Sequence, residues 1–581
     1  MTLRADGGPI VAAVAVVFGA RAGERLAWAA PALPGVVLIA GLPALLLALA
    51  GRHRWGRPAA GALLLIALGA VAMGRALAGL SGEPSRLSAG ETERRVTVRL
   101  AADPQGRWTG ARVPARLERV DHGGGRGTVL VVATRAAAER MPLLEAGESA
   151  VLLGHFRSLE AGEQRWRWRH VGAAFEAHDL IGAGPAEPVV LRAANGLRHR
   201  VLAGGEALDG TDRALVAGFL VGDDRNLPAE VAADFRASGL SHLLVVSGAN
   251  VTLALALVGP LLRRFRLLGR FLGGVTVLIL FCAMTRFEPS VLRAGVMSGL
   301  ALLATFLGRP ANGLRLLGLA VTGLVLLDPF LVHSLGFGLS CGASAGILLL
   351  AGPLAERFPG PRFLREPLAV TAAAQVGVAP LAFPAFGHLP LAALPANLAA
   401  APAAAALSIW GLGSGLAGGF FESPGVGPAA LLQLPTAMLA GWIRNVSHAA
   451  AGVPVMVTPR AAALLALVGV IWWRRSGVGP ESVRARRNRF VPERVGLQPE
   501  PVVGGQQAGP GQQQRRGGNG VEKVELEPAP ARLAEHADAP LDPGHDQQEL
   551  GGGECAPQPG QQTECQADPS DQFDADGGPG Q

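Results

Sequence analysis

Long apolar runs separated by short polar loops occupy two parts of the chain, residues 9–80 and 237–473. A helix that crosses a bilayer needs about 20 predominantly apolar residues. Runs of this kind predict spans at 9–20, 33–50, 58–80, 237–261, 271–286, 289–308, 316–334, 336–352, 366–388, 391–418, 428–447 and 455–473. We therefore expect a mainly α-helical polytopic membrane protein with about 12 spans, several of them broken by Gly or Pro.

Residues 94–180, between the two apolar parts, show a different pattern. Short runs with period-two alternation, such as RRVTVRL, GTVLVVA and ESAVLLGHF, are bounded by Gly, Pro and Asp. This pattern predicts five or six antiparallel strands. We expect a small β-barrel of the OB type, and a small sandwich suits the pattern equally well. Residues 191–236 are amphipathic and predict helices.

These patterns divide the chain into five parts. We expect membrane spans over 1–80, a β-rich domain over 90–190, an amphipathic helical segment over 191–236, a second set of membrane helices over 237–475 and a tail over 480–581. The tail is polar and low in complexity, so it cannot bury enough apolar surface to fold. We expect it to be disordered, and its composition also fits an out-of-frame reading of a GC-rich gene.

Charge supports the membrane assignment and orients it. Only 17% of the residues are charged, against about a quarter in soluble domains. The basic loops lie at 52–57, 263–270, 309–315, 356–366 and 474–475. With alternating spans they all fall on one side, which the positive-inside rule assigns to the cytoplasm. The β-rich domain is then extracytoplasmic, and the chain is expected in the cell inner membrane.

Composition argues against a metal site or a cofactor. The four cysteines at 282, 341, 555 and 565 have no metal-ligand spacing. The glycine-rich phosphate-binding motif of nucleoside triphosphatases is absent from the sequence. The apolar N-terminal run leads into further spans, so we expect no cleaved signal peptide.

Polar side chains inside or beside the predicted spans are the candidate functional residues, because a bilayer core offers them no water. They are Asp223, Arg225, His242, Ser247, Asn250, Arg293, Gln375 and Asn397. Each has a structural alternative. The sequence GDDRN suits a turn or a helix terminus, the histidine and the amides suit hydrogen bonds between helices, and the small residues near 247 suit either a broken helix or close packing. Arg293 is either a phosphate-guiding residue or a partner of Glu288.

The sequence RWRWRH at 165–170 is the clearest candidate for nucleic-acid contact. As a strand it would place Trp166 and Trp168 on one face and Arg165, Arg167 and Arg169 on the other. One face then packs into the core while the other meets solvent. The alternative is a stacking and phosphate-binding platform for single-stranded DNA, to which Trp108 could contribute.

Five short stretches, in order along the chain, resemble the ComEC competence family. They are Gly222-Asp223 with Gly239-Leu240-Ser241-His242-Leu243 and Ser247-Gly248; Pro289-Ser290-Val291-Leu292-Arg293-Ala294; Leu326-Leu327-Asp328-Pro329 with Gly336-Phe337-Gly338-Leu339-Ser340; Gln375 with Pro380 and Phe386-Gly387; and Asn397 with Pro402. Each stretch is weak alone, and the order makes the resemblance specific. Family members often carry Leu-His where this chain has Ala249-Asn250, so no histidine role transfers to that place.

The resemblance implies a channel, not an enzyme, that passes single-stranded DNA through the inner membrane in natural transformation. It also implies partners, namely single-stranded DNA, a competence DNA receptor and a cytoplasmic ATPase or helicase, beside the membrane lipid. Many members end in a metallo-β-lactamase-like domain, whose metal-binding cluster has no counterpart here. Two other functions remain open, a small-solute or lipid transporter and a truncated, inactive family member. The sequence does not indicate the oligomeric state.

Overall fold

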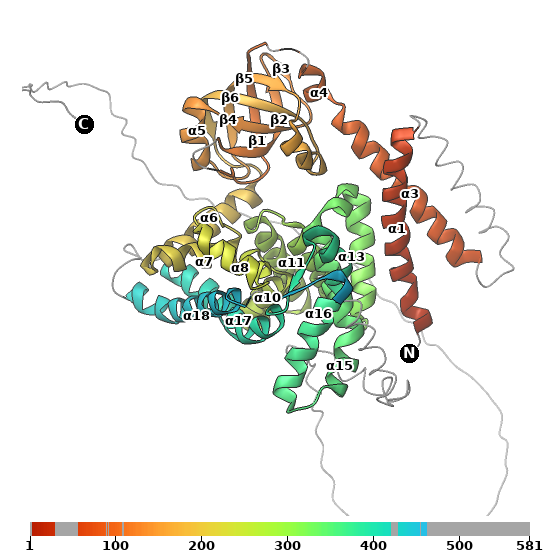
Figure 1. Cartoon of the computed structure of the whole chain (residues 1–581). Helices are drawn as coiled ribbons and strands as arrows, with labels where there is room; N and C mark the ends of the chain where they lie inside the picture. The colour runs from red at the N-terminus through yellow and green to blue at the C-terminus, as the bar shows by residue number, and fades with distance from the viewer. Residues whose placement is uncertain are drawn as a thin grey trace, which may run out of the picture. The chain divides into compact units, whose positions relative to one another are not determined.

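The computed structural model describes residues 3–29, 56–88, 90, 92–106, 110–419, 428–453 and 455–461 (Figure 1). The predicted span at 33–50, most of the one at 455–473, Trp108 and the tail at 480–581 lie outside the described residues.

The alternating segment forms a closed five-stranded barrel, so the barrel prediction is confirmed and the sandwich is excluded. Its strands are β1 (Arg94–Leu100), β2 (Arg112–Val120), β4 (Thr128–Ala133), β5 (Ser149–Arg157) and β6 (Val171–Gly184), with the two-residue β3 (Gly123–Gly124) at the edge of β2. The sheet order β1-β5-β6-β4-β2 closes through a β1–β2 pairing. Strands β4 and β6 pair in parallel and the other neighbours are antiparallel. Five strands in a small closed barrel is the strand number of the OB type.

Period-two alternation explains why these strands close around one core. In β1 the side chains of Val96, Val98 and Leu100 are buried while those between them are not, and β5 alternates over its whole length. Side chains on a strand point to opposite faces in turn. The inward set, which includes Phe156 packed edge-on against Phe175 at 4.9 Å between ring centroids, fills the barrel.

The remaining elements are helical. The N-terminal helices are α1 (Leu3–Ala29), α3 (Gly56–Leu80) and α4 (Glu83–Leu87), and the barrel carries α5 (Arg135–Arg140), η1 (Met141–Leu143) and η2 (Ala161–Arg169). After the barrel follow α6 (Val189–Gly204), η3 (Gly205–Ala207), α7 (Gly210–Val221), α8 (Ala229–Ala237), α9 (Ser241–Leu244), α10 (Gly248–Leu262), α11 (Leu267–Met284), α12 (Pro289–Phe306), α13 (Gly313–Leu327), η4 (Pro329–His333), α14 (Leu335–Gly346), η5 (Ile347–Ala351), α15 (Gly352–Arg357), α16 (Arg362–Phe386), α17 (Ala393–Gly418) and α18 (Pro428–Ala451). A two-residue pairing joins β7 (Leu389–Pro390) to β8 (Met456–Val457).

The expectation of about 12 spans is not supported. Within the described residues, six helices are long and apolar enough to cross a membrane: 59–87, α11, α12, the continuous 335–357, α16 and α17. Helices α10 and α13 are apolar but only 15 residues long. Apolar runs alone do not reveal where a helix ends.

The predicted span at 237–261 shows this directly. The structure ends α8 at Ala237, forms the four-residue α9, and passes through extended backbone at Val245 and Ser247 before α10 begins at Gly248. The break is therefore a built feature of the helical region, as the small residues near 247 allowed.

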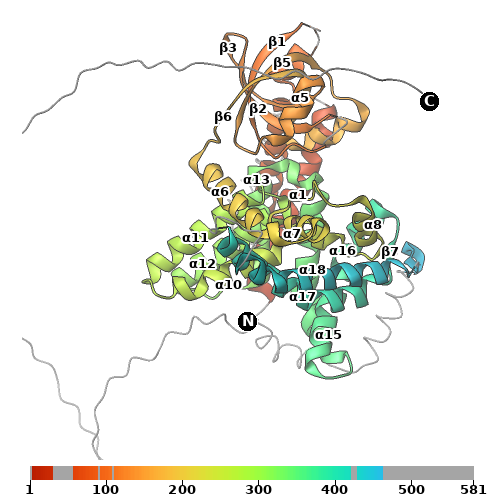
Figure 2. The ribbon, with the colours of Figure 1, turned by 90° about the vertical axis from the view of Figure 1, so that its left-hand side faces the viewer.

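Several helices approach one another through glycine. A Cβ at Gly342 or Gly346 of α14 would overlap the backbone of α16 at Gly377, and one at Gly204 of α6 would overlap the backbone of α17. Small residues at such contacts allow helices to pack closely in membranes. Helices α17 and α18 run side by side (Figure 2), with indole N–H groups donating to carbonyls across the pair, Trp410 to Leu432 and Trp442 to Ala399, each at 3.0 Å.

Candidate functional site

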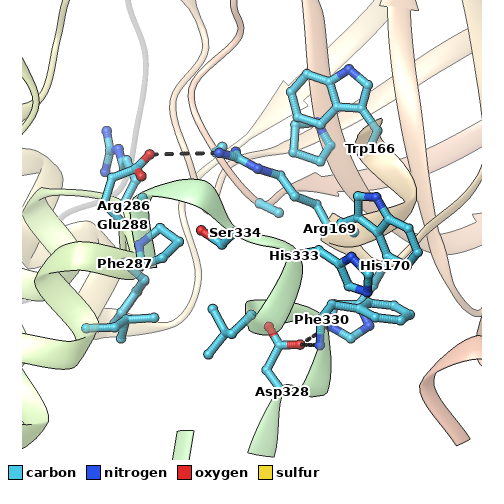
Figure 3. A pocket seen from close by; sticks show the side chains of 18 of the residues that line it. Trp166, Arg169, His170, Arg286, Phe287, Glu288, Asp328, Phe330, His333 and Ser334 are labelled. Carbon is cyan, nitrogen blue, oxygen red and sulfur yellow. Dashed lines mark hydrogen bonds and ion pairs between the residues drawn. The ribbon is translucent and has the colours of Figure 1, made fainter. Parts of the chain in front are cut away.

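A cavity of about 700 Å³ lies between the barrel and the helices. We call it the junction cavity. Its barrel side comes from the β1–β2 connection, β2 and η2, and its other side from the α11–α12 loop, the first turn of α12, η4 and the start of α14 (Figure 3). Pro289, Ser290, Asp328 and Gly336, all within the five family-like stretches, are among its lining residues. Stretches that are far apart in sequence therefore meet at one place.

The cavity lining combines positive charge with aromatic rings. Three arginines, Arg165, Arg169 and Arg286, face two carboxylates, Glu288 and Asp328. Figure 3 shows how both carboxylates reach toward η2 and the residue that follows it: Arg169 Nη2 lies 4.0 Å from Glu288 and His170 Nε2 lies 3.0 Å from Asp328. Such pairs at partly exposed sites are weak, so a stronger anion can displace them.

The prediction that RWRWRH forms an alternating strand is wrong. Residues 161–169 form the 3-10 helix η2. The cause lies just before RWRWRH, at the start of η2. There Glu160 and Glu163 form a capping box, and Arg157 makes a bidentate ion pair with the buried Glu163. These bonds satisfy the first turn of a helix, which outweighs the period-two pattern that follows.

The five residues predicted to contact DNA therefore do not divide into a tryptophan face and an arginine face. Trp166 is buried in a small cluster on the barrel with Leu130 and Val132, and the guanidinium groups of Arg165 and Arg169 lie 5.9 and 5.3 Å from its ring centroid. The ring of Trp168 leaves the barrel and stacks on His333 of η4, with centroids 3.7 Å apart. These four line the cavity, whereas Arg167 is half-buried and is not among its lining residues.

Next to the cavity is a buried group of charges, which we call the junction charge cluster; the sequence singled out Asp223 and Arg225 but not the other members. It comprises Asp103, Arg198, Asp223, Arg225 and Arg286. Arg198 of α6, only 1% exposed, lies 3.0 Å from Asp223 and 3.2 Å from Asp103. Arg286 holds the same Asp103 at 2.8 Å. The cluster therefore joins the barrel to three parts of the helical region.

Two helix ends explain why Arg198 is placed here. Its Nη1 donates to the carbonyls of Val221 and Met284, at the C-termini of α7 and α11. A cation at a helix C-terminus satisfies orphan carbonyls and complements the helix dipole. Gly222, with φ +76°, ends α7 in the left-handed conformation that favours glycine and brings Asp223 back toward Arg198.

Asp223 and Arg225 thus belong to the cluster. Arg225 makes two hydrogen bonds to the Asp223 carboxylate, at 2.8 and 2.7 Å. Burial alone would raise the pKa of Asp223, but the hydrogen bonds from Arg225 and the charge of Arg198 outweigh burial and lower that pKa to about 2. The same hydrogen bonds raise the pKa of Arg225. Both groups are charged at neutral pH and mutually neutralised.

The sequence did contain a signal for Arg198. Leu191, Ala194, Asn195 and Arg198 recur at helical spacing on the inner face of α6, and the last three are buried. A charge on the apolar stripe of an amphipathic helix indicates a buried partner. The identity of the partners could not be read from it, because Asp103 and Asp223 lie on other elements.

Ser247 and Asn250, at the break before α10, are held in a satisfied network. Asn250 is buried, donates to the Phe219 carbonyl of α7 at 3.0 Å, and accepts from Ser247 at 3.1 Å and Ser408 of α17 at 3.3 Å. His242 hydrogen-bonds the Gly239 carbonyl and neighbours Asn397, which donates to Thr371 of α16 at 3.0 Å. Gln375 lies half-buried on α16, one turn beyond Thr371.

Arg293 differs from the other buried arginines. It is 7% exposed, its Nε donates to the hydroxyl of Ser340 at 2.9 Å and its Nη1 to the sulfur of Met297 at 3.1 Å. Arg293 does not pair with Glu288, the alternative that the sequence left open, because Glu288 lies beside Arg169.

Comparison with known proteins places these residues in a family. Residues 219–476 match the family model described as Competence protein. An uncharacterized protein of Aquifex aeolicus (strain VF5) is 36% identical over 170 residues, 29% of this chain and 40% of the relative. ComE operon protein 3 of Bacillus subtilis (strain 168) is 22% identical over 291 residues, 50% of this chain and 36% of the relative.

A third relative is the uncharacterized protein YcaI of Escherichia coli (strain K12), 24% identical over 206 residues, 32% of this chain and 27% of the relative. The chain thus spans two fifths or less of the length of these relatives. No solved structure matches it. The family match covers in full five of the six described helices that are long and apolar enough to cross a bilayer, with the breaks, buried polar groups and cavity-lining turns described above. Residues 219–476 therefore carry a domain of the Competence protein family, and the long apolar helices indicate a membrane protein.

Proposed function

We propose that this protein conducts single-stranded DNA across the bacterial inner membrane during natural transformation, and that the strand enters through the junction cavity. Membership of the Competence family supports the link to DNA uptake. The barrel then lies on the extracytoplasmic side, and the helices on the far side of the cavity form the path. The role is that of a channel, not of an enzyme.

The composition of the junction cavity is the observation that carries this proposal. A single strand presents phosphates and unstacked bases, which proteins bind with basic side chains and aromatic rings in one groove. Arg165 and Arg169 supply the basic groups, and Trp168 supplies a ring already in stacking geometry with His333. Their carboxylate and imidazole partners are weak competitors that an arriving strand would replace.

The other candidate residues take distinct roles in this proposal. Asp223, Arg225, Ser247 and Asn250 hold the framework around the break before α10, because their polar groups are already engaged with protein partners. His242, Gln375 and Asn397 contribute polar groups along the helices beyond. Energy for transport comes from a cytoplasmic ATPase or helicase, and the strand is delivered by a competence DNA receptor.

Uptake of labelled DNA by cells tests the proposal. A strain deleted for this gene should lose uptake into the cytoplasm and transformation, and the intact gene should restore both. The double variant Arg165→Gln/Arg169→Gln should restore roughly one tenth of the wild-type level, the loss expected if the two contacts together contribute about 1.5 kcal/mol.

The matched control removes the same charge from the barrel outside the cavity. Arg116 and Arg119 are exposed on β2 and are not among the cavity-lining residues. The variant Arg116→Gln/Arg119→Gln should restore uptake fully. Normal uptake in the deletion strain would refute the channel, and equal losses in the two double variants would refute the cavity as the route.

A further inference from the structure

Arg293 carries a buried charge that the protein does not neutralise. Within the described residues no carboxylate lies within 4.0 Å of its guanidinium group, and Nη2 has no hydrogen-bond partner. Its hydrogen-bond partners are a hydroxyl and a thioether, neither of which carries charge, and the thiol of Cys341 lies near it. Burying an ion without a counter-charge is costly, so this placement calls for a ligand of opposite charge.

The start of α10 points to the same place. A Cβ at Gly248 would lie 2.6 Å from Nη2 of Arg293, so the guanidinium group is in contact with the first residue of the helix. Ser247, at the capping position, gives its hydroxyl to Asn250 and makes no cap to the backbone. The first N–H groups of a helix are unsatisfied and positive. The guanidinium group of Arg293 and the N-terminus of α10, both positive, therefore lie next to each other at the break.

Position in the fold connects this point to the junction cavity. Pro289 and Ser290, at the start of α12, line the cavity, and Arg293 follows one turn later on the same helix. Four residues of α-helix rise about 6 Å. Ser290 also donates to the Val246 carbonyl at 3.2 Å, which fixes α12 against the break before α10.

We propose that Arg293 and the N-terminus of α10 form a binding site for one oxyanion, about one helical turn beyond the junction cavity. In the context of the proposed function, on which this identity of the ligand rests, the oxyanion is a phosphodiester group of the passing strand. Inorganic phosphate shares that chemistry. A guanidinium and backbone N–H groups together are a usual way of binding phosphate.

A role limited to linking helices does not account for the residue. A hydrogen bond from α12 to Ser340 of α14 needs only a neutral donor, which glutamine or asparagine would provide without a buried charge. The chain uses neutral groups for such links elsewhere, as with Asn250 and Asn397.

The test uses the full chain in detergent and two probes at constant ionic strength, inorganic phosphate and a labelled single-stranded oligodeoxynucleotide. Phosphate should raise the thermal unfolding midpoint of the wild type with a saturable dependence. In Arg293→Met the rise should be lost, and oligonucleotide affinity should fall at least about tenfold, the effect of losing a charge-assisted contact. Ser340→Ala keeps the charge and should keep both responses.

Arg116→Gln serves as a second control, since this exposed arginine on β2 lies outside the cavity lining and its loss should leave the phosphate-dependent rise in place. If Arg293→Met does not fold, Gly248→Ala replaces it, because the added Cβ would lie 2.6 Å from Nη2 of Arg293, displace the far end of that side chain and so abolish the rise. A folded Arg293→Met or Gly248→Ala protein with the wild-type phosphate response would overturn the site.

The two probes separate this inference from the proposed function. Response to phosphate but equal oligonucleotide affinity in wild type and Arg293→Met would support the oxyanion site and exclude the strand as its source. A wild-type phosphate response together with normal DNA uptake in the deletion strain would leave the site standing and refute the channel. Normal uptake supported by Arg293→Met, with no phosphate response in the wild type, would refute the site alone.

Discussion

Arg198 and Arg293 are both almost wholly buried, yet the protein surrounds them in opposite ways. Arg198 contacts two carboxylates and two helix-terminal carbonyls. Arg293 contacts a hydroxyl and a thioether. A buried charge with all its partners inside the protein is a structural element, whereas one without a counter-charge is poised for something outside it. The comparison separates the residues that hold the framework from the one that we propose binds.

Removing the first arginine should have the largest effect on stability. Arg198→Ala leaves Asp103 and Asp223 short of a counter-charge and two helix-terminal carbonyls without a donor, and it should cost about 3–5 kcal/mol. The free energy of unfolding in detergent, titrated with sodium dodecyl sulfate, measures the loss. Arg192→Ala, an exposed position on the same helix, is the control and should change it by less than about 0.5 kcal/mol. Equal effects of the two changes would contradict the structural role of the cluster.

Acid should weaken the same cluster over a defined range. The pKa of Asp223 falls from 3.8 to about 2 on folding. A lowered pKa in the folded state stabilises the protein above the unfolded value, and the contribution is lost as pH falls from near 4 through about 2. The contribution is about 2 kcal/mol. Unfolding midpoints of wild type and Asp223→Asn should differ at pH 6 and converge near pH 2. A constant difference over that range would refute the assignment.

The neutral network at the break before α10 should be worth less. Asn250→Ala leaves the buried Phe219 carbonyl without its donor, and we expect a loss of about 1–3 kcal/mol. The same denaturant titration measures it. Thr252→Ala, an exposed residue on α10 that bonds only within its own helix, provides the comparison and should fall well below this loss. A value for Asn250→Ala no larger than for Thr252→Ala would show that the network does not hold the break.

Removing the second arginine should have the smallest effect on stability. In the absence of added oxyanion, the free energy of unfolding of Arg293→Met should be within about 1 kcal/mol of the wild-type value or above it. The reason is that an apolar chain of similar length replaces an uncompensated buried charge. This is the opposite of Arg198→Ala, and differential scanning in detergent compares them directly. A loss as large as that of Arg198→Ala would mean that Arg293 is a framework residue too.

The barrel could be predicted from the sequence because its signal is local. Alternation in β1 and β5 reports which side chains face inward. The same rule failed at 165–170, where alternation was real but the preceding Glu160 and Glu163 started a helix. Local pattern predicts an element only where no stronger local interaction competes for the backbone.

The site could be predicted only in part, because its contacts join distant segments. The sequence singled out Arg293, Trp168 and Arg169, and the structure brings two of them to one cavity and the third within a turn of it. It gave no sign that Asp103 partners Arg286, 183 residues away. Such pairings depend on the packing of the barrel against the helices, which no local pattern encodes.

Asp103 has a consequence for how this protein can change over generations. It belongs to the β1–β2 connection of the barrel, yet both of its arginines come from the helical region. A chimera given another barrel of the same fold would take one counter-charge away from both Arg198 and Arg286 unless the new connection carried an acid at the same place. The barrel and the helices therefore cannot be exchanged independently of each other. A substitution in one of them limits which substitutions the other can accept.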